Sequence, residues 1–380
     1  MASPPRDLIL RTLAAGTAAG AAAISLRALA RPLPAGERTL VDWEAVRAAA
    51  RMRTGETGPQ GVAGAEALGV AYDAMAAELA PLVSEVVQTP VAGYPPFAVL
   101  DRRGFIDANL VMARRLLEPL ERVRGQLPES RATALGRTVM SRYMGELFGF
   151  LSRRVLGQYD PVLMLAPAGE RAGSALLLVE PNVRAFERRQ ALPAESLRRW
   201  LVLHELTHAW QFETHPWLRE HLASIMRDLL GGELLSNMAA TLEAGSPRTK
   251  GQPNPVLRGL VPAVRGQLQA VARVQAVMSV AEGHGNFVMH RVGRAHITDF
   301  EQLELGFHQR ASQRSLLEQL VLIVTGLRMK MRQYELGERF AESVTQRGGV
   351  ELLNAVWNGP ESLPTLAELR EPERWIRRVG

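Results

Sequence analysis

The sequence predicts a mainly α-helical fold with a small β-sheet, and two observations support this expectation. Through most of the chain, apolar residues recur at intervals of three and four, the period of helices that bury one face. The clearest strand signal is the short, uninterrupted apolar run at residues 175–179, which Pro181 ends. Long helical stretches and so few strand signals indicate helices packed around a minor sheet.

The first half of the chain is expected to be helical, with short interruptions. Four stretches have the helical period: residues 41–53, 65–87, 105–127 and 129–154. Pro81 and Pro119 fall inside two of them, and each should kink or split its helix, because proline lacks the backbone N–H. Residues 55–64 read as a Gly-rich linker, and residues 97–100 as the end of a strand or the entry to a helix.

The second half is expected to be helical from Pro193 almost to the C-terminus. Residues 245–255 form its one long polar interruption, and no internal repeat is present. We therefore expect a single catalytic domain over residues 39–380, with two closely packed helical lobes as the alternative. Residues 1–38 would form an Ala/Gly-rich tail or targeting segment.

Composition excludes several classes of function. Of the 380 residues, 47% are hydrophobic, 22% are charged and none is cysteine. Disulfides, thiolate zinc sites and cysteine nucleophiles are thereby excluded, so any metal must be held by His, Asp or Glu. The net charge is +6, but the arginines are scattered along helices beside acidic residues, without a basic run interleaved with aromatics. We expect no nucleic-acid partner.

The N-terminal segment leaves the location of the protein open. Arg6 and Arg11 precede an Ala/Gly-rich stretch, and residues 28–30 (Ala-Leu-Ala) have the pattern of a signal cleavage site. The stretch is short and weakly apolar, so we expect no integral membrane span. The expected location is cytoplasmic, and the alternatives are a secretory signal or an amphipathic tail with weak membrane association.

The segment with the strongest chemical signal is His204-Glu205-Leu206-Thr207-His208, which lies in an apolar helical run. Residues four apart share a helix face, so the imidazoles of His204 and His208 can reach one ion. Glu205 is offset from that pair and can approach a zinc-activated water without displacing a ligand. The sequence therefore predicts zinc on His204 and His208, with Glu205 as the general base.

A catalytic zinc usually takes a third protein ligand and keeps one position open. Residues 280–291 offer the best candidates, because Glu282, Asn286 and His290 fall on one helix face among small residues that allow close helix approach. His284 is about 200° around the helix from Glu282, so both cannot easily face one ion. Glu282 is the preferred ligand and His284 its rival, while His290 would line the site or support a ligand.

Two further segments are candidates for binding and catalysis. Tyr334, or Arg332 beside it, would stabilise the oxyanion that forms on a carbonyl. The polar cluster at residues 158–160 would orient substrate or a ligand. For each, packing or a surface ion pair is the alternative reading.

Several motifs together resemble a bacterial family of zincin-like zinc metallopeptidases, some of whose members are associated with deazaflavin-cofactor biosynthesis. The similar segments are residues 41–43, 155–160, 204–213, 282–289 and 330–340. The resemblance runs from Leu40 to the C-terminus and implies a mostly helical zincin-like fold with one zinc. The strand expected at residues 175–179 lies upstream of the His204–His208 motif, at a distance compatible with the edge strand that holds an extended substrate in zincin folds.

The resemblance bears on individual residues as well. His204, Glu205 and His208 match the zincin motif, and Glu282 matches the acid that opens the second family segment. Family members commonly have Tyr at the position of His284, which favours Glu282 as the ligand. The expected function is a zinc-dependent metallopeptidase acting on a peptide or small amide. The alternatives are a zinc hydrolase of a small non-peptide amide or ester, and a non-catalytic zinc-stabilised binding protein with His284 as fourth ligand.

Overall fold

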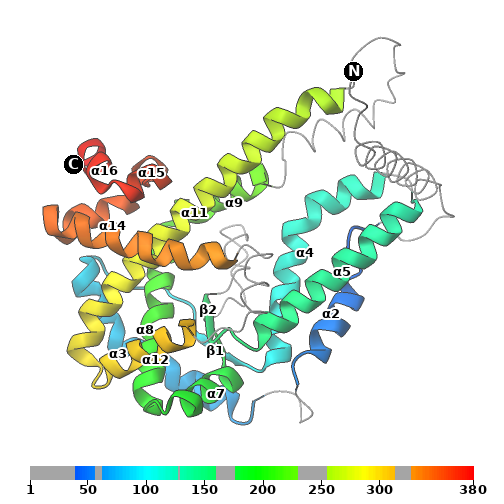
Figure 1. Ribbon diagram of the computed structural model, residues 1–380. Helices are drawn as coiled ribbons and strands as arrows, with labels where there is room; N and C mark the ends of the chain where they lie inside the picture. Colours follow the sequence, from blue (N-terminus) through cyan, green and yellow to red (C-terminus); the bar gives the residue numbers. More distant parts are fainter. Residues whose placement is uncertain (1–38, 56–61, 127–128, 160–175, 230–254, 313–326) are drawn as a thin grey trace, which may run out of the picture.

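The computed structural model describes residues 39–55, 62–126, 129–159, 176–229, 255–312 and 327–380, and shows helices packed around a small sheet (Figure 1). The helices are α2 (Trp43–Met52), α3 (Ala65–Val87), α4 (Arg102–Gln126), α5 (Arg131–Ser152), α7 (Glu180–Gln190), α8 (Ala194–Glu213), α9 (Pro216–Leu229), α11 (Pro255–His296), α12 (Phe300–Ser312), α14 (Leu327–Asn354), α15 (Leu366–Arg370) and α16 (Pro372–Val379). The strands are β1 (Phe97–Leu100), β2 (Gly157–Tyr159) and β3 (Leu176–Val179). The prediction of a mainly α fold with a small sheet is confirmed.

The three strands lie in the order β1-β3-β2. Strand β1 runs parallel to β3, and β2 pairs antiparallel to it with Gly157 opposite Leu178. The expectation that residues 175–179 form an edge strand is therefore wrong, because β3 lies between the other two. All four residues of β3 are buried, which explains the uninterrupted apolar run in its sequence.

Helix α8 lies at the centre of the fold. It packs against α3, α11 and α12, and it also contacts β2 and β3. From Leu201 to Phe212 every residue is buried except His204 and His208, which are half-buried. This stretch of α8 is buried on nearly all sides, and the two histidines mark the part of its surface that stays partly exposed.

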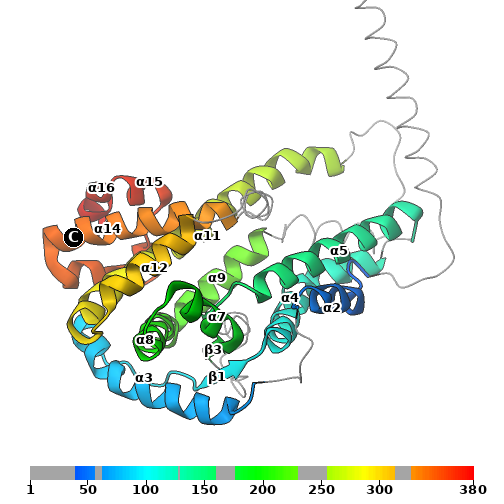
Figure 2. The ribbon, with the colours of Figure 1, turned by 60° about the horizontal axis from the view of Figure 1, so that its bottom comes forward.

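The buried apolar side chains form two clusters. The larger one surrounds α8 and draws on α3, β3, α11 and α14, while a smaller one joins α2, α4 and α5. Figures 1 and 2 show α2, α4 and α5 side by side, and α14 beside α11 with α15 and α16. The division into one catalytic domain or two lobes stays a prediction.

The long helix α11 crosses α14 at very short range. A Cβ atom added to Gly283 of α11 would lie 2.1 Å from the backbone carbon of Gly337, and one added to Gly337 would lie 1.8 Å from the carbonyl oxygen of Ser279. Only glycine can occupy both positions while the backbones stay this close. The small residues noted in this part of the sequence thus allow the close helix approach, which fixes the position of Glu282 beside Gly283.

Other features of the sequence also have a direct counterpart. Asp42 caps α2 by accepting a hydrogen bond from the backbone N–H of Ala45, which is 3.0 Å away. Pro81 and Pro119 lie inside the continuous helices α3 and α4, so neither splits its helix. Among the described residues, no helix combines the length and apolar character needed to cross a bilayer. The N-terminal segment 1–38 and nearly all of the polar stretch 245–255 lie outside those residues.

Candidate metal centre

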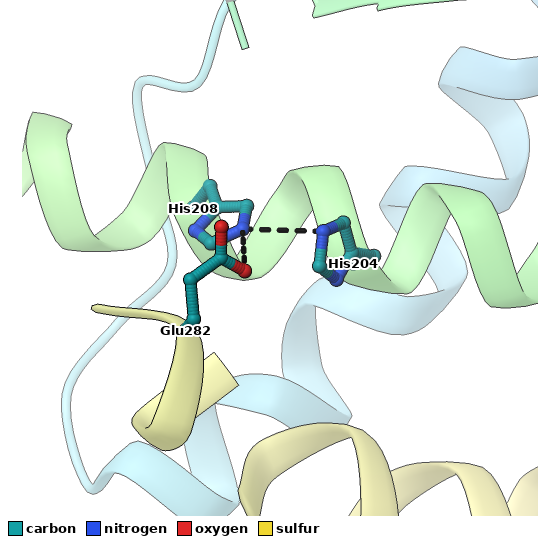
Figure 3. A group of neighbouring side chains, drawn as sticks. All are labelled: His204, His208 and Glu282. Carbon is teal, nitrogen blue, oxygen red and sulfur yellow. Dashed lines mark hydrogen bonds and ion pairs between the residues drawn. The ribbon is translucent and has the colours of Figure 1, made fainter. Parts of the chain in front are cut away.

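His204 and His208 present their Nε2 atoms to one point, as their spacing on the helix predicts. The two Nε2 atoms are 3.2 Å apart, and the ring planes meet at 86°. Glu282 approaches from α11, with its Oε2 atom 3.6 Å from Nε2 of His208 (Figure 3). Ligand atoms of the three residues all lie within 4.8 Å of one another.

This donor set fits a zinc ion. Two imidazole nitrogens and one carboxylate oxygen, without thiolates, are the ligands of a common class of catalytic zinc site. Glu282 is only 3% exposed, and burial of a carboxylate is costly unless a cation or hydrogen bonds compensate. Within the described residues the group has three members, which is the usual number of protein ligands at a catalytic zinc.

Glu205 lies between α8 and the sheet. A Cβ atom added to Gly157 would lie only 2.5 Å from its Oε1 atom, so the carboxylate rests against the backbone of β2. Its negative charge also acts on His208 one turn along the helix. Gly157 was not predicted as a site residue, although glycine inside a strand often marks a close approach by another group.

An aromatic wall, formed by Trp200 and Phe307, borders the metal group. The ring of Trp200 stacks on His204 with 5.6 Å between centroids, and Phe307 stacks on the indole at 4.0 Å. Trp200 precedes His204 by one helical turn, so the i, i+4 spacing could have identified it. The stacking holds the plane of the His204 imidazole nearly parallel to the indole.

Comparisons with known proteins identify the family of the chain. The model of the zincin-like metallopeptidase family matches residues 41–376. The chain belongs to this family. A crystal structure of a candidate hydrolase with a novel fold from Chloroflexus aurantiacus is 32% identical, with a TM-score of 0.65 over 89% of this chain and 98% of that one. No curated protein sequence matches the chain. The predicted family is thereby confirmed.

His284 does not belong to the metal group formed by His204, His208 and Glu282. Its Nδ1 atom lies 3.4 Å from Nε2 of Gln211, and its Nε2 atom lies 3.3 Å from Oδ1 of Asn354. Burial lowers the pKa of His284 to about 4, so the ring is neutral at pH 7. The angular separation from Glu282 along α11 explains why only one of the two reaches the histidines of α8.

Of the remaining candidates, only His290 has a described side chain. His290 lies between two carboxylates, with its Nε2 atom 2.5 Å from Glu304 and its Nδ1 atom 3.8 Å from Glu338. Tyr334 and Arg332 are on α14, but their side chains lie outside the described part of the chain. The catalytic roles of His290 and Tyr334 therefore stay predictions.

The two described residues of the polar cluster, Gln158 and Tyr159, are engaged in hydrogen bonds with other side chains. Gln158 donates a hydrogen bond to Oδ1 of Asn109 at 3.3 Å. The hydroxyl of Tyr159 donates to Glu213 at 2.7 Å and accepts from Arg219 at 2.9 Å. Burial and the neighbouring carboxylate raise the pKa of Tyr159, which keeps the phenol protonated. Asp160 lies outside the described residues.

Zinc binding is expected to weaken steeply as the pH falls. Burial lowers the pKa of His208, but the hydrogen bond and charge of Glu282, with the charge of Glu205, raise it to about 9 overall. In the metal-free protein, both ring nitrogens of His208 are then protonated at neutral pH. Zinc must displace one of these two protons to bind. The apparent zinc affinity should fall about tenfold per pH unit below pH 9 from this group alone.

This pH dependence can be measured in two ways. The His208 resonance of the metal-free protein should titrate near pH 9 in NMR spectra. Competition with a chelator between pH 6 and 9 should give the corresponding slope in zinc affinity. A His208 titration near the ordinary value of about 6.5 would contradict this expectation.

Replacement of Gly157 by alanine is expected to displace the carboxylate of Glu205. The added methyl group would lie 2.5 Å from Oε1 of Glu205 and 3.0 Å from Cδ2 of Leu178. The atoms that the added methyl group meets belong to Glu205 and Leu178 and not to the three proposed metal ligands, so zinc content should remain that of the wild type while hydrolysis falls by up to about 100-fold. Zinc analysis, thermal unfolding and rate measurements on the folded variant test this, and an unchanged rate would contradict it.

Proposed function

We propose that this protein is a zinc-dependent hydrolase of the metallopeptidase type, which cleaves amide bonds with Glu205 as general base. His204, His208 and Glu282 would hold the metal. The observation that carries the proposal is the arrival of Glu282 from α11 at the two histidines of α8, beside the carboxylate of Glu205. Membership of the zincin-like metallopeptidase family supports the same chemistry.

Each residue of the site has a defined task in this proposal. Zinc, when bound, supplies a Lewis acid that lowers the pKa of water and polarises a carbonyl group. Glu205 takes the proton of the attacking water at its carboxylate and passes it to the leaving amine. Gly157 has no side chain, so the carboxylate of Glu205 can pack directly against β2. This packing fixes the position of the carboxylate before substrate binds.

The surroundings of the site favour a catalytic over a structural metal. A structural zinc site is closed by four protein ligands, whereas the described residues supply three. His284, the fourth ligand in the non-catalytic alternative, has its two ring nitrogens directed at Gln211 and Asn354. His204 and His208 are the accessible residues of an otherwise buried stretch of helix, as substrate access requires.

The experiment that tests this function is an activity screen of the zinc-loaded full chain. A peptide library analysed by mass spectrometry tests amide cleavage, and nitroanilide and nitrophenyl ester substrates test the small-molecule alternative. We expect cleavage of peptides that is lost on chelation and restored by zinc. Ester or small-amide turnover without peptide cleavage would support the alternative substrate class. No turnover of any substrate by zinc-loaded protein would overturn the proposal.

A further inference from the structure

We propose that Gln211, His284 and Asn354 form a hydrogen-bond chain of fixed direction that holds the metal ligand His208 in the tautomer with its proton on Nδ1. These three residues would be positioning residues, since none belongs to the metal group. This hydrogen-bond chain runs from α8 through α11 to the C-terminal end of α14, and it ends on the backbone at the end of α3. The inference rests on the proposed metal site only at its last step, the role of His208.

The direction of the chain is set first at Asn354. Its Nδ2 atom donates to the carbonyl oxygen of Val87 at 2.9 Å. A carbonyl oxygen can only accept, so the amide of Asn354 cannot be flipped without placing two oxygens against each other. Its Oδ1 atom therefore faces His284, where it lies 3.3 Å from Nε2. Since this oxygen can only accept, Nε2 of His284 must carry the ring proton.

A second backbone carbonyl sets the direction at Gln211. Its Nε2 atom donates to the carbonyl oxygen of Ala281 at 2.8 Å, which fixes the orientation of the amide. The second proton on this nitrogen points to Nδ1 of His284 at 3.4 Å. That atom is an acceptor in the tautomer required by Asn354. The two independently fixed amides thus assign the same tautomer to His284.

The orientation of Gln211 in turn determines the state of His208. Its Oε1 atom lies 2.9 Å from Nδ1 of His208 and accepts the proton of that nitrogen. When zinc displaces the other ring proton of His208, the lone pair for the metal is therefore on Nε2, the atom that faces His204 and Glu282. Groups that fix the tautomer and ring orientation of a ligand commonly tune metal affinity.

Packing holds the central ring of the chain in place. Trp210 stacks on His284 with 5.2 Å between ring centroids, and its indole N–H donates to Thr89 at 3.0 Å. His284 is 1% exposed, so water does not compete with its two partners. The end of α3 is thereby tied to the metal ligand through Asn354 and through Trp210.

The tautomer of His284 tests the inference directly. Full-length protein with ¹⁵N-labelled histidine, free of metal at pH 7, should show His284 as the neutral Nε2–H tautomer, with its signals assigned by their absence from His284→Phe. A proton on Nδ1, or on both nitrogens, would overturn the proposed direction of the chain. This measurement needs no zinc, so its result is independent of whether the proposed function is correct.

The effect on the metal site is tested by zinc affinity. His284→Phe keeps an aromatic ring against Trp210 but removes both polar contacts, and we expect zinc binding at least about tenfold weaker than in the wild type. His215→Phe is the matched control, because His215 also packs on Trp210 and Trp357, but its Nδ1 atom hydrogen-bonds to the backbone oxygen of Gln211 and not to the side chain. Its zinc affinity should stay within about twofold of the wild type. Equal losses in the two variants, or no loss in His284→Phe, would overturn the positioning role.

Discussion

Glu205→Gln is expected to retain zinc and to lose nearly all hydrolytic activity. Glutamine has the shape of glutamate and fits the space beside Gly157, so the helix and the three metal-binding side chains are undisturbed. An amide cannot accept the proton of the attacking water, and loss of a general base typically lowers the rate by about 100- to 10,000-fold. Turnover numbers and zinc content of the same preparation measure both parts of the expectation.

The matched control for this substitution is Glu195→Gln. Glu195 lies in the first turn of the same helix, is exposed and is remote from the histidines in sequence. Its replacement removes the same charge from α8, and activity should remain close to that of the wild type. Full activity in Glu205→Gln would exclude Glu205 as the base. Loss of zinc from that variant would instead assign Glu205 a role in holding the metal.

Gly337→Ala is expected to be strongly destabilising. The added methyl group would meet the carbonyl oxygen of Ser279 at 1.8 Å, and this oxygen belongs to the backbone of α11 and cannot rotate away. The two helices must therefore separate, at a cost of about 3 kcal/mol or more in the free energy of unfolding. Because Glu282 adjoins the crossing point at Gly283, zinc affinity should fall as well.

Gly136→Ala provides the contrast, because it makes the same change in helix α5 where nothing lies within 4 Å of the added methyl group. Helix propensity alone should make this variant up to about 1 kcal/mol more stable. Chemical unfolding of both variants in the presence of zinc gives the comparison. Similar stabilities would show that α11 and α14 do not pack as closely as described.

The three residues of the candidate metal centre were the most predictable part of this molecule. The relation between His204 and His208 is local, since helix geometry alone places residues four apart on one face. Glu282 was predicted by the composition of its segment and by resemblance to the zincin-like family, and the structure brings it to the histidines. Helix geometry also predicted that Glu282 and His284 point to different sides of their helix, so that both cannot easily face one ion.

What escaped prediction depends on contacts between distant segments. Strand β2 has only three residues, too few for a recognisable alternation, so the central position of β3 could not be derived. The importance of Gly157 and Gly337 depends on which backbone or carboxylate each one meets, and sequence spacing does not specify that. The hydrogen-bond partners of His284 are Gln211 and Asn354, which are 73 and 70 residues away along the sequence.

The metal content of the purified full chain is the most direct test of the proposed zinc site. Wild-type protein should contain about one zinc per molecule. His204→Ala and Glu282→Ala should each lose most of it, because each removes one of the three donors that lie within 4.8 Å of one another. Wild-type protein that binds neither zinc nor a comparable divalent metal would contradict the account, as would Glu282→Ala protein with undiminished zinc.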